Sequence, residues 1–276
     1  MSNWPAVPPT VPATTTREPG GTMKIVRIDA EADDITYGAV EPDGIRLFHG
    51  SPFFQWERSE TVLPITQVKL LAPVIPTKVV AVGRNYVDHA AEMDSAVPES
   101  PIIFLKPPTS VIGPLAPIKI PPQSSMVHHE GELAAVMGKV TRNISSADAA
   151  QHILGYTAAN DVTARDLQRG DGQWTRGKGF DTFCPLGPAI DTEFDPTEAN
   201  RITCSVNGEL KQEGTTNEMV FGVADLVAFI SSVMTLLPGD VILTGTPAGV
   251  GPVLAGDHVE VDIEGIGVLM NPVVTA

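Results

Sequence analysis

The stretch MVHHEGELAAVMGK, residues 126–139, decides how the rest of the chain is interpreted. Leu133 to Met137 form a short, continuous apolar run, which predicts a buried β-strand. Two carboxylates, Glu130 and Glu132, open this strand. Burial of one carboxylate is costly, and burial of two neighbouring ones without compensation should be prohibitive. Either both side chains face water, or a positive group lies between them.

The composition describes a globular protein that can bury a core. The chain has 276 residues, of which 42% are hydrophobic and 18% are charged. Its 33 acidic and 18 basic side chains give a formal net charge of −15 at pH 7. This charge argues against nucleic acid or an anionic membrane as the main partner. An anionic substrate would have to be attracted by local features such as a metal ion, a few cations or backbone amides.

Cysteine content and the N-terminal composition favour a cytoplasmic protein. Cys184 and Cys204 indicate neither a disulfide framework nor a zinc cluster, so a reducing compartment fits best. No apolar run approaches the ~18 residues that a membrane span needs. Residues 1–22 are rich in Pro and Thr and lack the apolar core of a secretory signal, so we expect a disordered leader there.

From Met23 onward the pattern is rich in short strands separated by turn residues. Residues 23–72 predict a small N-terminal β domain, and residues 73–276 predict a larger second domain. Asn207-Gly208 predicts a hairpin turn. Apolar residues at helical spacing predict helices within 145–156 and 221–240. There is no repeat and no regular strand–helix alternation, so we predict an α+β fold, mainly β and mainly antiparallel, with a few flanking helices.

Three acidic residues suggest a metal site. Side chains two positions apart on a strand share a face, roughly 7 Å apart, so Glu130 and Glu132 can converge while Gly131 leaves the backbone between them uncluttered. Asp161 follows another apolar run. Three carboxylates at a partly buried site favour a divalent cation, and oxygen-only ligation indicates Mg²⁺ or Mn²⁺ rather than zinc. The alternative is that the glutamates face solvent at a strand end and Asp161 caps a helix.

A second group has the pattern of a general base. His89 and Glu92 are three residues apart and would meet on one helical turn. A carboxylate beside an imidazole fixes its tautomer and raises its basicity, as a base acting on water needs. Arg84 and Tyr86 lie just before this pair, at a strand-to-helix transition. The alternative is an ordinary pair on a helix surface.

Two further residues lie in glycine-rich surroundings. Lys178, between Gly177 and Gly179, could neutralise a developing oxyanion or a substrate carboxylate. It could equally be a solvated loop lysine. Thr246 lies in a loop after a predicted strand, where backbone amides could bind a carboxylate. The loop has neither a dinucleotide fingerprint nor a Walker pattern, so nucleotide binding is not expected.

Taken in order, seven blocks of the chain resemble the fumarylacetoacetate hydrolase family. They are GRNYVDHAAEM, FLKPPTSVIG, HHEGELAAVMGK, NDVTARDLQ, GKGFDTFCPLGP, VNGELKQEG and LTGTPAGVGP. The likeness runs from about Lys78 to the C-terminus. It is nearest to the acylpyruvate hydrolase/oxaloacetate decarboxylase enzymes and the 2-hydroxyhepta-2,4-diene-1,7-dioate isomerases. The resemblance implies a mixed β-sandwich roll, a homodimer and one Mg²⁺ or Mn²⁺ per subunit.

The resemblance also implies roles for individual residues. Metal ligands would be Glu130, Glu132 and Asp161; catalytic residues would be His89, Glu92 and Lys178; and substrate-binding residues would be Arg84, Tyr86, Gln168 and Thr246. His89 and Glu92 would lie on a lid that orders over the substrate. Two roles are open for Arg165, which either contacts the substrate or supports the metal loop by pairing with a carboxylate.

The implied activity is metal-dependent C–C bond cleavage in small 2-oxo or 1,3-dicarbonyl acids. Hydrolysis of an acylpyruvate and decarboxylation of oxaloacetate both pass through an enolate that the metal would stabilise. Reprotonation of the same enolate elsewhere would instead make the protein an isomerase of 2-hydroxyhepta-2,4-diene-1,7-dioate or 5-carboxymethyl-2-hydroxymuconate, in aromatic catabolism. A third hypothesis is a non-catalytic module that binds metal or a 2-oxo acid. The predicted His89–Glu92 base argues against it, because binding alone requires no base.

Overall fold

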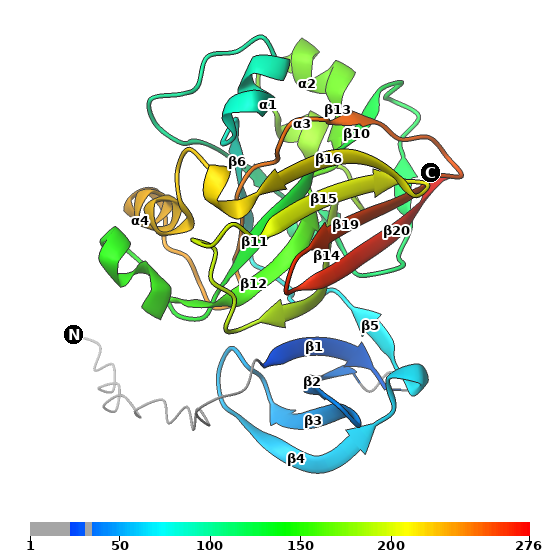
Figure 1. Ribbon diagram of the computed structural model, residues 1–276, viewed down its shortest axis with the longest axis vertical. Helices are drawn as coiled ribbons and strands as arrows, with labels where there is room; N and C mark the ends of the chain where they lie inside the picture. Colours follow the sequence, from blue (N-terminus) through cyan, green and yellow to red (C-terminus); the bar gives the residue numbers. More distant parts are fainter. Residues whose placement is uncertain (1–22, 31–34) are drawn as a thin grey trace, which may run out of the picture.

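The computed structural model describes residues 23–30 and 35–276, so the predicted disordered leader, residues 1–22, lies outside the described residues. The described chain is mainly β, and its few short helices lie on the flanks of the sheets (Figure 1). The prediction of a mainly β, mainly antiparallel α+β fold is confirmed. None of the helices in the described part of the chain is long and apolar enough to cross a membrane.

Five strands form an N-terminal β unit, drawn in blue and cyan below the main body in Figure 1. They are β1 Lys24–Asp29, β2 Ile35–Glu41, β3 Gly44–Gly50, β4 Trp56–Leu63 and β5 Lys69–Leu71, with a 3₁₀ turn at Ile65–Gln67. Strand β1 pairs with β2 and β5, and its first two residues also pair with β14, Cys184–Asp191. The sheet of this unit is therefore continuous with the main sheet.

The main sheet carries the site-bearing strands near its centre. Beyond β14 its order is β12-β11-β17-β6-β7. The bounds are β6 Val79–Gly83, β7 Ile102–Lys106, β11 Gly131–Met137, β12 Ile153–Asn160 and β17 Val241–Leu243. Strand β11 pairs antiparallel with β12 and β17, whereas β17 and β6 run parallel. Every residue of β11 is buried, as the continuous apolar run of the opening stretch predicts.

A second, five-stranded sheet packs against one face of β11 and β12. Its strands, in spatial order, are β16 Glu209–Thr215, β15 Arg201–Val206, β19 His258–Ile263, β20 Gly267–Thr275 and β9 Ile118–Ile120. The predicted turn at Asn207-Gly208 joins β15 to β16, with φ of 53° and 79°, the left-handed pair that tight hairpins require. Small additional strands are β8 Val111–Ile112, β10 Val127–His129, β13 Thr163–Ala164 and β18 Gly251–Pro252.

Tertiary pairing overrides the helix predicted within 145–156. Only a 3₁₀ helix, Ser146–Gln151, forms there, and Ile153 begins strand β12. The prediction was wrong because apolar spacing over a few residues fits a helix and a strand alike. Pairing of Ile153 with Met137, and of Tyr156 with Ala135, places this segment in the main sheet.

The helix predicted within 221–240 is present but ends early. Helix α4, Val223–Val233, stops at Met234, which is extended, although the breaking Pro238-Gly239 lies further along. Leu236 instead forms an isolated β-bridge with Thr141. The remaining helices are α1 Val87–Glu92, α2 Arg165–Asp171 and α3 Thr175–Lys178, with 3₁₀ turns at Pro108–Ser110 and Thr216–Glu218.

Asp240 fastens the turn before β17 to the segment before β6. Its carboxylate is fully buried and accepts hydrogen bonds from Thr77 N (3.1 Å), Thr77 Oγ1 (2.6 Å) and Lys78 N (3.1 Å). It also accepts a bond from Leu237 N (2.7 Å) and forms an ion pair with Lys78 Nζ. These bonds align the parallel strands β6 and β17, which lead into helix α1, Val87–Glu92, and into the Thr246 loop.

We therefore expect Asp240→Ala to lower the free energy of unfolding by about 3 kcal/mol, since Thr77, Lys78 and Leu237 would lose their common buried acceptor. Urea denaturation followed by circular dichroism measures this change. Asp262→Ala is the matched control, because Asp262 is exposed on β19, and should shift the free energy by less than about 0.5 kcal/mol. Equal stability of the two variants would contradict the assigned role of Asp240.

Candidate metal centre and substrate cavity

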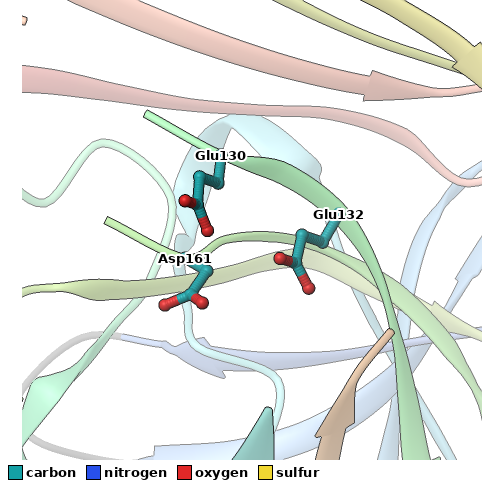
Figure 2. A group of neighbouring side chains, drawn as sticks. All are labelled: Glu130, Glu132 and Asp161. Atoms are coloured by element: carbon teal, nitrogen blue, oxygen red, sulfur yellow. The ribbon is translucent and has the colours of Figure 1, made fainter. Parts of the chain in front are cut away.

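Three buried carboxylates meet where the main sheet opens toward solvent. Glu130, Glu132 and Asp161 are 4%, 1% and 1% exposed, and one oxygen of each lies within 4.8 Å of the others. Figure 2 shows Glu130 just before β11, Glu132 on β11 and Asp161 on the adjacent segment, with all three side chains close together. The structure thus contradicts the solvent-facing alternative. Helix α2 begins after Ala164, so Asp161 caps no helix.

Gly131 lets the two glutamates share one face. A Cβ atom at Gly131 would lie 3.1 Å from Cys204 Cβ and 3.3 Å from a Val261 methyl group, both in the second sheet. The side of the strand opposite the carboxylates is therefore packed against a neighbouring sheet. A Cβ atom at this position would therefore require Cys204 or Val261 to shift by a few tenths of an ångström.

Three buried cations surround two of the carboxylates. Lys178 Nζ donates to Glu130 Oε2 at 2.7 Å and to Asp161 Oδ2 at 2.6 Å. Arg165 pairs with the other oxygen of Glu130, and Lys106 pairs with the other oxygen of Asp161. Lys178 is thus no solvated loop lysine. Of the two roles open for Arg165, the structure shows the pairing with a carboxylate.

The pKa values of the two glutamates are shifted in opposite directions. Burial would raise the pKa of Glu130, but the charges of Lys178 and Arg165 outweigh burial and hold it well below its usual range. Glu132 has no cation partner among the described residues. Burial, together with the charges of Asp161 and Glu130, raises the pKa of Glu132 well above its ordinary value, opposed by Lys178 and by the Gly245 N–H, which donates at 2.8 Å.

The donor set fits a hard divalent cation. Each ionised carboxylate has about four lone-pair sites, so the oxygens already bonded to Lys178, Arg165 or Lys106 can accept a further partner. Glu132 is the carboxylate whose burial no cation compensates, and a divalent ion beside it would supply the missing positive charge. All three candidate ligands are oxygen donors, and no histidine belongs to this group within the described residues. Oxygen-only ligation favours Mg²⁺ or Mn²⁺.

Helix α1 brings the His89–Glu92 pair over the centre. His89 is buried, and its Nδ1 lies 3.1 Å from Glu92 Oε2, so the pair is more than an ordinary surface contact. The Glu92 carboxylate also accepts from Gly249 N at 3.2 and 3.3 Å. This bond fastens α1 to the loop after β17. His89, Glu130 and Glu132 line the same cavity.

A cavity of about 600 Å³ lies between helix α1 and the two glutamates. Its wall includes Glu130, Glu132, the His89–Glu92 pair and Lys178, together with Arg84, Gln168, Arg169 and Thr246, whereas Asp161 does not belong to it. Phe104 and Trp174 form an aromatic side wall, with ring centroids 5.2 Å apart, and Lys178 Nζ lies 5.1 Å from the Phe104 centroid.

The predicted substrate-binding residues differ in their position. Arg84 lines the cavity and has a φ of 59°, a left-handed conformation that is costly for an arginine and that concentrates at functional sites. Gln168 Oε1 accepts from Arg165 Nη1 at 2.8 Å. Tyr86 is buried and does not belong to the cavity wall, and its hydroxyl has no hydrogen-bond partner in the described structure. Burial raises the pKa of Tyr86.

Two buried polar residues near the centre were not predicted as site residues. Lys106 is the last residue of the apolar strand β7 and precedes a proline. It forms an ion pair with Asp161, which lies 55 positions further along the chain, so its neighbours in the sequence do not indicate the pair. Gln212 is 1% exposed and bonds to Gly131, Thr246 and Pro247. In the sequence, Gln212 is a single glutamine among the mostly polar residues of β16, and nothing nearby indicates these bonds.

Comparison with known proteins identifies the class. The family described as fumarylacetoacetate (FAA) hydrolase, C-terminal, matches residues 78–274, and the chain belongs to this family. Residues 23–73 match a family described as Rv2993c-like, N-terminal. The sequence-based assignment to the family is thereby confirmed.

Individual relatives agree with this assignment. Human mitochondrial oxaloacetate tautomerase FAHD2A is 51% identical over 226 residues, covering 77% of this chain and 72% of the relative. The crystal structure of 5-carboxymethyl-2-hydroxymuconate delta-isomerase from Mycobacterium smegmatis is 48% identical, with a TM-score of 0.86, and covers 92% of this chain and 100% of that one. The crystal structure of 2-hydroxyhepta-2,4-diene-1,7-dioate isomerase from Mycobacterium marinum is 47% identical, with a TM-score of 0.84, and covers 92% of this chain and 98% of that one. The predicted family fold is confirmed.

We expect Glu132→Gln to weaken Mg²⁺ binding by more than about 100-fold, since loss of a direct ligand should exceed the 10–100-fold effect of losing a supporting residue. Isothermal titration calorimetry with Mg²⁺ measures this effect. Glu57→Gln, a change at an exposed glutamate of β4, is the control and should leave the affinity unaltered. Wild-type affinity in Glu132→Gln would mean that Glu132 is not a ligand.

Proposed function

We propose that the chain is a divalent-metal-dependent enzyme that forms an enolate from a small 2-oxo acid and transfers a proton to or from it, as a tautomerase or isomerase. The observation that carries this proposal is the meeting of the carboxylate group and the His89–Glu92 base in one cavity. A protein that only bound its ligand would not need a base there. The names of the relatives, a tautomerase and two isomerases, support the same reaction type.

The residues divide the chemistry between them. Glu130, Glu132 and Asp161 would hold Mg²⁺ or Mn²⁺, which when bound supplies the Lewis acidity that stabilises an enolate. His89 would exchange the proton at the substrate carbon, because its Nδ1 is held by Glu92 and its Nε2 is then the free basic atom. Lys178 would place its positive charge beside the developing oxyanion. Thr246 would contact the substrate carboxylate.

Cleavage of a C–C bond is the second candidate. The same His89–Glu92 pair could activate water for acylpyruvate hydrolysis, or the enolate could arise from loss of CO₂ from oxaloacetate. A panel of oxaloacetate, an acylpyruvate and a hydroxymuconate derivative separates these reactions. Loss of the enol absorbance without release of pyruvate indicates tautomerisation, whereas pyruvate detected by a coupled dehydrogenase indicates cleavage.

The cavity wall favours a substrate with a second carboxylate. Arg84 and Arg169 both line the cavity, and neither forms a hydrogen bond or ion pair with any described residue. In a chain of net charge −15, two unpaired guanidinium groups in one cavity are a selective feature. We therefore propose that the substrate is a dicarboxylate. We also propose that the enzyme is a homodimer and acts in the cytoplasm.

A test of the binding site comes before the substrate panel. Thermal unfolding should shift upward with Mg²⁺ or Mn²⁺, and further with oxalate, which mimics the carboxylate and enolate oxygens. Oxalate should have no effect after treatment with EDTA. Stabilisation by oxalate with metal, combined with no turnover on any member of the panel, would instead support the non-catalytic module.

His89→Ala should lower turnover on the active substrate by about 10²–10⁴-fold, because general acid–base catalysis contributes that much. Its Mg²⁺ affinity should stay at the wild-type value, since His89 is not a predicted ligand. Steady-state kinetics and calorimetry give the two quantities. If His89→Ala and Glu132→Gln lose metal affinity equally, the division of roles between them is wrong.

Arg84→Met and Arg169→Met should each raise the KM for oxaloacetate by about tenfold or more, the loss of one hydrogen bond to a charged group. The KM for acetylpyruvate, which has a single carboxylate, should change much less. Arg58→Met alters an exposed arginine that is paired with Glu41 in the N-terminal unit and serves as the control. Equal KM changes for the two substrates would remove the argument for a dicarboxylate.

A further inference from the structure

Gln212 connects three separate parts of the centre. It lies on β16 in the second sheet, yet its side chain reaches the start of β11 and the loop after β17. Its Oε1 accepts from Gly131 N at 2.9 Å and lies 3.0 Å from His129 Nδ1. Its Nε2 donates to Thr246 Oγ1 at 2.7 Å and to Pro247 O at 2.8 Å.

Chemistry fixes the orientation of this amide. The Pro247 carbonyl can only accept, so the atom facing it must be the NH₂ group, and the Gly131 N–H can only donate, so the atom facing it must be the oxygen. Every hydrogen of the Gln212 side-chain amide is therefore in use. Strand β16 also packs closely on Pro247, since a Cβ atom at Gly214 on this strand would lie 2.7 Å from Pro247 Cβ.

The same bonds decide what Thr246 can offer to a ligand. Its Oγ1 receives a hydrogen from Gln212 and donates its own to Gly131 O at 2.8 Å. The hydroxyl has no hydrogen left for an anion. The Thr246 N–H, by contrast, has no acceptor in the described part of the chain, and Thr246 belongs to the cavity wall.

We propose that Gln212 is a positioning residue that locks the Thr246 hydroxyl onto the Gly131 peptide and leaves the Thr246 backbone N–H as the donor to a substrate carboxylate. This inference rests on the proposed function. Gln212 neither contacts the carboxylates of the proposed metal ligands nor lines the cavity. It therefore acts through the groups that it bonds, above all the Gly131 peptide and Thr246.

Gln212→Glu separates the bond that Gln212 accepts from Gly131 N from the bonds that it donates to Thr246 and Pro247. The variant is isosteric and keeps an oxygen for Gly131 N, but it replaces both hydrogens toward Thr246 and Pro247 by a second acceptor. With Mg²⁺-loaded protein, oxalate affinity measured by calorimetry should fall about tenfold or more, the loss expected when a donor to a charged ligand is misplaced. Mg²⁺ affinity should not fall. Gln212→Leu removes both the acceptor for Gly131 N and the donors to Thr246 and Pro247, so it should lower the affinities for Mg²⁺ and for oxalate.

Controls keep the outcomes distinct. Glu213→Gln is the opposite isosteric change one residue further along β16, at an exposed side chain, and should leave oxalate affinity unchanged. In the wild-type protein, amide exchange followed by NMR should slow at Thr246 when oxalate is added to the Mg²⁺ form; this measurement stands even if a variant fails to fold. Wild-type oxalate affinity in Gln212→Glu, or unaltered exchange at Thr246, overturns the role of Gln212 alone. Failure of wild-type protein to bind oxalate with Mg²⁺ overturns the proposed function as well.

Discussion

The structure depends on compensating three carboxylates that are buried together. Removing one such group from water costs several kcal/mol unless opposite charge and hydrogen bonds replace the lost hydration. The chain supplies that charge from three elements: Lys106 ends β7, Arg165 begins α2 and Lys178 ends α3. Glu132 alone is left with no cation among the described residues. The electrostatics therefore favour a divalent ion beside Glu132.

Packing between the two sheets fixes the positions of the carboxylates and of the loop beside them. Gly131 allows β11 to approach the second sheet closely on one face while the glutamates project from the other. Gln212, which belongs to that second sheet, then ties the Gly131 peptide to the Thr246 loop. Helix α1 is attached to the same loop, because Glu92 accepts from Gly249 N. The three carboxylates, the His89–Glu92 pair and the Thr246 loop are thus linked through backbone groups that packing holds in place.

This arrangement is suited to reactions that share an enolate. Lewis acidity at the carboxylate group, a base on α1 and a buried ammonium group would each stabilise or protonate the same species. Tautomerisation, isomerisation and cleavage differ in where the proton goes and which bond breaks. Under the proposed function, Arg84 and Arg169 in the cavity wall would select for a different property, the number of carboxylates that the substrate carries. Reaction type and substrate choice would then depend on separate residues that can be altered one at a time.

The sequence by itself determined the local features. A continuous apolar run after Glu130 predicts the buried strand β11, Asn207-Gly208 predicts the hairpin between β15 and β16, and the ordered motifs predict the family. Local spacing was insufficient at Ile153, where helical and strand periodicities coincide and pairing with Met137 decides the outcome. Only the tertiary structure brought Lys106 to Asp161 and Gln212 to Thr246, because a buried charge or amide selects its partner by proximity in space, and nothing in its sequence neighbours records that choice.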